Sequence, residues 1–100
     1  MLNILSYQFG GPFHEASTNF NEVACVYVIL DSFRDKLYYI DVGETDKLKT
    51  RLATHERREC WERNSNGDIY VAVYREDNTD RRLRIEREIR EAFKFPCGEE

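Results

Sequence analysis

The feature that most constrains the fold is a glycine, Gly43, which lies between a segment of strand length and a segment with helical periodicity. Residues 37–42 are rich in aromatic and β-branched side chains, as strands are. After the glycine, three side chains recur at i, i+4 and i+7 on one face of an α-helix, namely Leu48, Leu52 and His55. Thr45 or Asp46 can cap this helix by accepting hydrogen bonds from its free N–H groups. The segment therefore predicts a strand that ends at the glycine, followed by a helix over about 45–57.

The remaining elements follow from the same two periodicities. Residues 25–30 form another apolar run of strand length, and a short polar connection suited to a hairpin joins it to residues 37–42. A third strand is predicted at 69–74 and a last helix at 79–94, with Pro96 past its end. The order β-β-α-β-α predicts an α/β (α+β) fold, in which a small, three-stranded, mainly antiparallel sheet is flanked by helices.

The length of 100 residues permits one domain with one core. Because the breaker Gly10-Gly11-Pro12 lies in an irregular stretch, residues 1–22 are predicted to be an extended N-terminal arm on a domain at 23–100. No run approaches ~18 apolar residues, and the start of the chain lacks the basic-then-apolar order of a signal peptide. These features predict a cytoplasmic protein without a membrane partner.

The three cysteines, Cys25, Cys60 and Cys97, are odd in number, far apart, and form no C-x-x-C pair. This usage predicts reduced thiols rather than a disulfide framework. His55, Cys60 and Cys97 are residue types that bind zinc, but their spacing matches no common zinc module.

The net charge of −4 disfavours strong nucleic-acid binding, which depends largely on Lys and Arg. The basic residues are nevertheless clustered after residue 46. The candidates for phosphate contacts in this cluster are Lys47, Lys49, Arg51 and Arg58. The sequence therefore predicts, at most, weak nucleic-acid binding by the domain alone, and it leaves a protein partner or a homodimer open.

Two strand positions carry candidates for chemistry. Since side chains alternate along a strand, Tyr39, Asp41 and Gly43 are predicted to share one face, and the phenol of Tyr27 on the neighbouring strand can meet them. Tyr27 also fits a tyrosine that only packs its ring. Asp41 also fits a partner for the turn, or a helix cap.

Arg51 and His55 lie one turn apart on the predicted helix. A planar guanidinium donates to two phosphate oxygens at once, which suits a phosphate whose charge grows in a transition state. The alternative is a solvated helix arginine. His55 is either a general acid–base group or a cation favoured by the helix dipole.

Glu86 lies on the border of the apolar face of the last predicted helix, about 60° from Ile89 and about 20° from Phe93. A carboxylate there needs a partner, and a divalent metal is one. Arg82 and Arg90 at i−4 and i+4 are others, so an ion-paired surface residue is the alternative.

In this order and spacing, the motifs resemble the GIY-YIG nuclease domain family over residues 24–98. Tyr27, in Cys25-Val26-Tyr27, matches the tyrosine of the first motif, and Gly43, in Asp41-Val42-Gly43, matches the glycine of the second. Cys25 stands where the family has its first glycine, and Asp41 stands where it has its second tyrosine.

The resemblance extends to Arg51, eight residues after the motif glycine, as the catalytic arginine, and to Glu86 as the metal-binding glutamate. It implies metal-dependent endonuclease hydrolysis of DNA or RNA phosphodiesters, with one Mg²⁺ or Mn²⁺ on Glu86 and the phosphate charge stabilised by Arg51. Tyr27, Tyr39 or Asp41 would take the proton from the attacking water. The alternative is a module that kept the fold, lost turnover, and binds nucleic acid or a protein.

Overall fold

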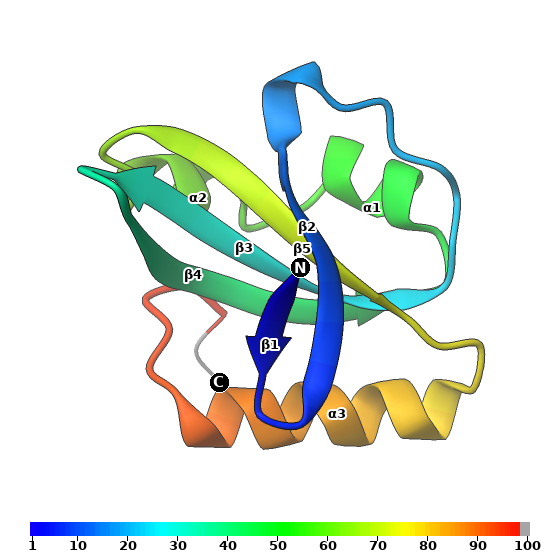
Figure 1. Ribbon diagram of the computed structural model, residues 1–100. Coiled ribbons are helices and arrows are strands. Elements are labelled where there is room, and N and C mark those ends of the chain that lie inside the picture. The colour runs from blue at the N-terminus through cyan, green and yellow to red at the C-terminus, as the bar shows by residue number, and fades with distance from the viewer. Residues whose placement is uncertain (99–100) are drawn as a thin grey trace.

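The computed structural model describes residues 1–98, whose strands form one five-stranded antiparallel sheet in the order β1-β2-β5-β3-β4 (Figure 1). The elements in chain order are β1 (Leu2–Ile4), β2 (Tyr7–His14), a 3₁₀ turn η1 (Glu15–Ser17), β3 (Cys25–Phe33), β4 (Lys36–Thr45), α1 (Leu48–Ala53), α2 (Arg58–Arg63), β5 (Asp68–Arg75) and α3 (Thr79–Ala92). The mixed α/β class is confirmed, but the sheet is wider than the three strands predicted. No helix among residues 1–98 is long and apolar enough to cross a membrane.

The two additional strands come from the N-terminal residues. Phe9 and Ile4 are fully buried against the sheet and α3, so this segment belongs to the core. Gly10-Gly11-Pro12, which suggests a breaker in the sequence, lies inside β2, where the register against β5 shifts between Gly10 and Phe13. Gly and Pro are tolerated at such irregularities, so they mark a bulge here and not a strand end.

The helices cover both faces of the sheet, α3 on one side and α1 with α2 on the other (Figure 1). The central strand β3 supplies both cores, as its alternation predicts. Val26, Val28 and Leu30 belong to the cluster that includes Ile85 and Ile89 of α3. The residues between them belong to the cluster on the other face, namely Cys25, Tyr27 and Ile29, with Leu48, Leu52 and Trp61.

The prediction that the strand ends at Gly43 is wrong. β4 continues to Thr45, because its ladder with β3 persists to the pair Cys25–Thr45. The helix predicted over 45–57 is shorter, since α1 covers only Leu48–Ala53, and a second helix, α2, follows it at Arg58–Arg63. His55 lies in the connection between the two helices. This break allows both short helices to bury apolar side chains on the same sheet face.

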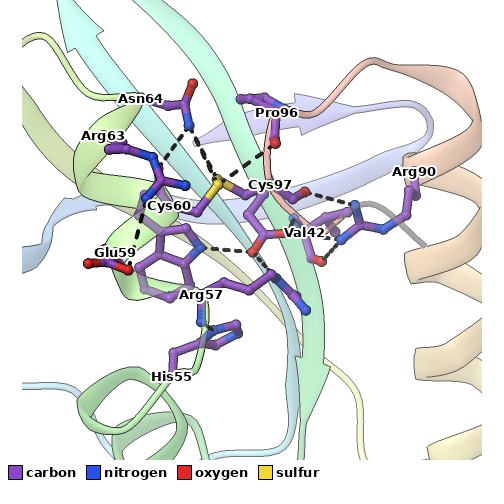
Figure 2. The surroundings of a disulfide bond; sticks show 12 residues. Val42, His55, Arg57, Glu59, Cys60, Arg63, Asn64, Arg90, Pro96 and Cys97 are labelled. Carbon is purple, nitrogen blue, oxygen red and sulfur yellow. Dashed lines mark hydrogen bonds and ion pairs between the residues drawn. A yellow bond between two sulfur atoms is a disulfide. The ribbon is translucent and has the colours of Figure 1, made fainter.

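The C-terminal segment returns to the edge strand β4, and the Cys97 N–H donates to the Ile40 carbonyl at 3.1 Å. There Cys97 forms a disulfide with Cys60 of α2, with the two Cα atoms 5.9 Å apart (Figure 2). The prediction of three reduced thiols is therefore wrong for these two, because a separation of 37 residues in sequence hides their proximity in space. Cys25 is a free, buried thiol.

Candidate functional site

The candidate site is built around Tyr27 and Gly43, which are paired across β3 and β4. The absence of a side chain at Gly43 gives room to the Tyr27 phenol: a Cβ there would lie 2.4 Å from Oη. A close approach of this kind is a position that only glycine fits. The phenol is thereby held at the edge of the sheet, where it is 1% exposed.

His55 fixes the Tyr27 hydroxyl from the connection between α1 and α2. Its Nε2 lies 2.7 Å from Tyr27 Oη, and its Nδ1 accepts a hydrogen bond from the backbone N–H of Arg57 at 3.0 Å. Because Nδ1 accepts, the single proton of a neutral imidazole lies on Nε2 and is donated to the phenol oxygen. The Tyr27 oxygen is then an acceptor from His55, and its own proton is free for another partner.

Burial governs the protonation of both rings. Burial, together with the charges of Arg51 and Arg57, lowers the pKa of His55 to about 4, so the imidazole is neutral at neutral pH. Burial raises the pKa of Tyr27 to about 12, although the nearby charge of Arg51 opposes this shift. The pair is a neutral donor and a neutral phenol in the resting protein.

The His55 imidazole is therefore expected not to titrate between pH 8 and pH 5, unlike an unperturbed histidine with a pKa of about 6.5. Between about pH 6.5 and pH 4 the unfolded chain binds a proton here that the folded chain does not. The contribution of His55 to the free energy of unfolding is therefore complete above about pH 6.5, and it declines as the pH falls through this window. A proton NMR titration of the imidazole C–H resonances, assigned with a His14→Gln variant, tests this; a midpoint near 6.5 for His55 would contradict it.

Arg51 of α1 lies beside the phenol, but its fork is occupied. Both terminal nitrogens donate to the carboxylate of Glu56, at 2.7 and 3.0 Å. Those hydrogen bonds lower the pKa of Glu56 to about 2, so the pair is fully ionised at neutral pH. The guanidinium already holds an oxyanion in the bidentate geometry that suits a phosphate.

Asp41 is fully buried in the edge strand and joins the two helical layers. Its Oδ2 accepts from Arg57 Nε at 2.7 Å and from Trp61 Nε1 at 2.8 Å, both on the α2 side. Its Oδ1 accepts from Arg90 of α3 at 2.9 Å and from the Val42 N–H at 2.8 Å. Figure 2 shows Arg57 and Arg90 reaching β4 from opposite sides.

These contacts define what Asp41 can do. Burial disfavours its charged form, but the hydrogen bonds from Arg57, Trp61 and Arg90 outweigh burial and hold its pKa below the ordinary value. A carboxylate with both oxygens in use and a lowered pKa is a weak base and has little capacity for a metal. It also makes no cap, since the N-cap residue of α1 is Lys47 and has no side-chain hydrogen bond.

Tyr39 lies on the other face of the sheet from the site. The register against β3 shifts between Ile29, paired with Asp41, and Leu30, paired with Tyr39, so Ile40 is an extra residue on β4. This β-bulge breaks the predicted alternation, and the Tyr39 ring packs 4.8 Å from that of Phe93 after α3. The prediction that Tyr39 shares a face with Asp41 is therefore wrong.

Glu86 is a half-buried residue of α3 whose pKa is raised by burial, against the opposing charge of Arg90. Arg90 Nε is 3.6 Å away, longer than a good N–H···O hydrogen bond. Arg57, reaching around the edge of β4, places its charge near both Glu86 and Tyr27. Glu86 itself belongs to α3, on the opposite face of the sheet from α1, which carries Arg51 (Figure 1).

The resemblance implies a divalent metal, and Glu86 is the one carboxylate that it assigns to that metal. Within residues 1–98, no group of three or more His, Cys, Asp or Glu side chains is placed so that it could hold a metal ion. Mg²⁺ sites commonly use one or two carboxylates, with water and substrate oxygens supplying the rest. Glu86, poorly paired and made more basic by burial, suits such a site.

The predicted phosphate contacts divide into two groups. Lys47 and Lys49 are exposed near the start of α1. Arg58 is instead engaged by the fold, since it donates to Glu15 at 2.8 Å and to the Leu52 carbonyl at 2.8 Å. It is a weaker candidate for nucleic acid than the lysines.

The site residues that sequence reasoning missed are Glu56 and Arg57, which follow His55 directly. Only their charge and their place at the end of the predicted helix signalled them.

Comparisons with protein-family models, with curated proteins and with solved structures found no match for this chain.

Proposed function

We propose that this domain is a GIY-YIG-type, metal-dependent endonuclease that hydrolyses DNA or RNA phosphodiesters. The observation that carries the proposal is the assembly of Tyr27, His55 and Arg51 beside Gly43, in the strand–glycine–helix order that resembles the family. The part of the chain that resembles the family contains the helices and three of the five strands, which lie in the spatial order β5-β3-β4. β1 and β2 lie outside it.

Each residue has a defined role in the proposed reaction. Arg51 binds the phosphate and stabilises its developing charge. Tyr27 first loses its phenolic proton to solvent, and the resulting phenolate, stabilised by the His55 Nε2–H and by the charge of Arg51, then takes the proton from the attacking water and becomes a phenol again. Asp41 positions Arg57 and takes no proton. Glu86 would hold the divalent cation, which would supply positive charge to the phosphate oxygens.

The test is cleavage of mixed nucleic-acid substrates with Mn²⁺ by the wild type and by Arg51→Ala and Glu86→Ala. Loss of Arg51 is expected to lower the rate by about 10²–10³-fold. Arg63→Ala and Glu91→Ala are matched controls, because both remove an exposed charge from α2 or α3. Since the pKa of Tyr27 is raised to about 12, the rate should also rise with pH through pH 9. Equal cleavage by wild type and both site variants would identify a contaminant and end the proposal.

The second candidate function is a binding module that kept the fold without turnover. Two observations favour it: Tyr27 is 1% exposed, and both oxygens of Asp41 are occupied. A salt-sensitive gel shift without cleavage would support this candidate. Absence of nucleic-acid binding at low salt would instead support a protein partner or a homodimer.

A cytoplasmic location stays a prediction, and the Cys60–Cys97 disulfide weighs against it. Disulfides are rare in reducing compartments. Alkylation of free thiols in intact cells, followed by mass spectrometry of Cys60 and Cys97, tests the location: alkylated cysteines indicate a reducing compartment, and an intact disulfide indicates an oxidising one.

A further inference from the structure

The carboxylate of Glu56 lies between two arginines. Its oxygens accept from both terminal nitrogens of Arg51, and Oε2 is also 3.7 Å from Arg57 Nη1. A planar oxyanion is thus bound by one guanidinium fork and lies near one nitrogen of a second guanidinium. This is the arrangement that recognises a phosphate with two charged oxygens.

The second arginine is rigidly placed. Arg57 Nε donates to the fully buried Asp41, which Trp61 also holds, so this side of the guanidinium is committed to the fold. The nitrogen facing Glu56 is Nη1, a different nitrogen from the Nε that Asp41 holds. Fixing one side of the fork leaves the other preorganised to bind an anion.

The occupant is much more exposed than its binding groups. The Glu56 side chain is 61% exposed, whereas those of Arg51 and Arg57 are 32% and 29% exposed. Glu56 lies in the connection between α1 and α2, so its side chain can leave without moving a helix. An incoming anion can therefore replace it at little structural cost.

We propose that Arg51 and Arg57 form a two-arginine site for a phosphate anion, and that Glu56 occupies this site as an internal competitor. The proposal rests on the proposed function only for the natural ligand, which would be a phosphodiester of the nucleic-acid backbone. Binding of a phosphate anion itself requires no turnover and no metal. Asp41 then acts as a positioning residue for Arg57.

The experiment is an NMR titration of the metal-free protein with inorganic phosphate at low ionic strength, following the Arg Nε–Hε signals and the backbone amides. Glu56→Gln is expected to tighten phosphate binding by about fivefold, the upper range for release of an exposed ion pair. Glu59→Gln is the matched control, since it makes the same charge change three residues away at an 88% exposed side chain. Sodium chloride at equal ionic strength controls for screening.

Arg57→Gln is expected to abolish the phosphate-induced shifts, and Arg57→Lys, which keeps an ion pair with Asp41, to weaken them. The lysine variant keeps the test valid if the glutamine variant fails to fold. Equal tightening by Glu56→Gln and Glu59→Gln, or unchanged binding in Arg57→Lys, would overturn the proposal. If phosphate binds as expected while no form of the protein cleaves nucleic acid, the anion site stands and the proposed hydrolysis fails.

Discussion

Reduction of the Cys60–Cys97 disulfide is expected to lower the free energy of unfolding by about 4 kcal/mol. The bridge joins residues 37 apart, and a closed loop of that length restricts the unfolded chain by about this amount. The bridge also lies beside a backbone hydrogen bond, from Cys97 N–H to Ile40, that pairs the C-terminal segment with the edge strand. Since small domains are stable by about 5–15 kcal/mol, the loss would be a large share of the total.

Urea unfolding with and without a thiol reductant measures this effect, with mass spectrometry confirming the thiol state. The double variant Cys60→Ser with Cys97→Ser is the control, and its unfolding midpoint should not respond to reductant. Unchanged stability of the fully reduced wild type would show that the bridge contributes nothing and that packing alone holds the C-terminal segment.

The parts of the fold that could be predicted are those with clean periodicity. β3 alternates between two apolar cores, and α3, expected at 79–94, is found at Thr79–Ala92 with Asn78 as its cap. β1 has only three residues, too few for a pattern, and β2 contains glycines and a proline that resemble a breaker. The break between α1 and α2 contains no glycine or proline, so it follows from packing and not from local propensity.

The candidate site was predictable only where its residues follow strand or helix periodicity. Tyr27 meets Gly43 of the neighbouring strand, as the strand pattern predicts. Its contact with His55 was not predicted, because His55 lies between α1 and α2 and not on a helix. The bulge at Ile40 contains no glycine, so nothing in the sequence indicates that Tyr39 turns to the other face. The partners of Asp41 come from positions 16, 20 and 49 residues later, and only tertiary packing brings them together.

Replacing Asp41 by Asn is expected to lower the free energy of unfolding by about 3 kcal/mol. The substitution removes the charge between Arg57 and Arg90, and breaking a buried ion pair costs about 3–5 kcal/mol. The lower end applies because the arginine side chains keep 29% and 18% of their exposure and can reach water. An Asn that served only as a helix cap would leave stability almost unchanged, since Asn caps as well as Asp.

The pH dependence separates the charge from the shape of the side chain. The pKa of Asp41 is lowered in the folded state, so its contribution is complete above the unfolded value of about 3.9 and is lost as the pH falls through the folded value. The stability difference between wild type and Asp41→Asn should therefore be largest near neutral pH and shrink below about pH 4. Urea unfolding at pH 7 and pH 3 measures it, with the exposed Asp46→Asn as the control. Equal unfolding midpoints at pH 7 would show that water replaces Asp41 as a partner of both arginines at no cost in stability. Asp41 would then not be needed to position Arg57, as the two-arginine site requires.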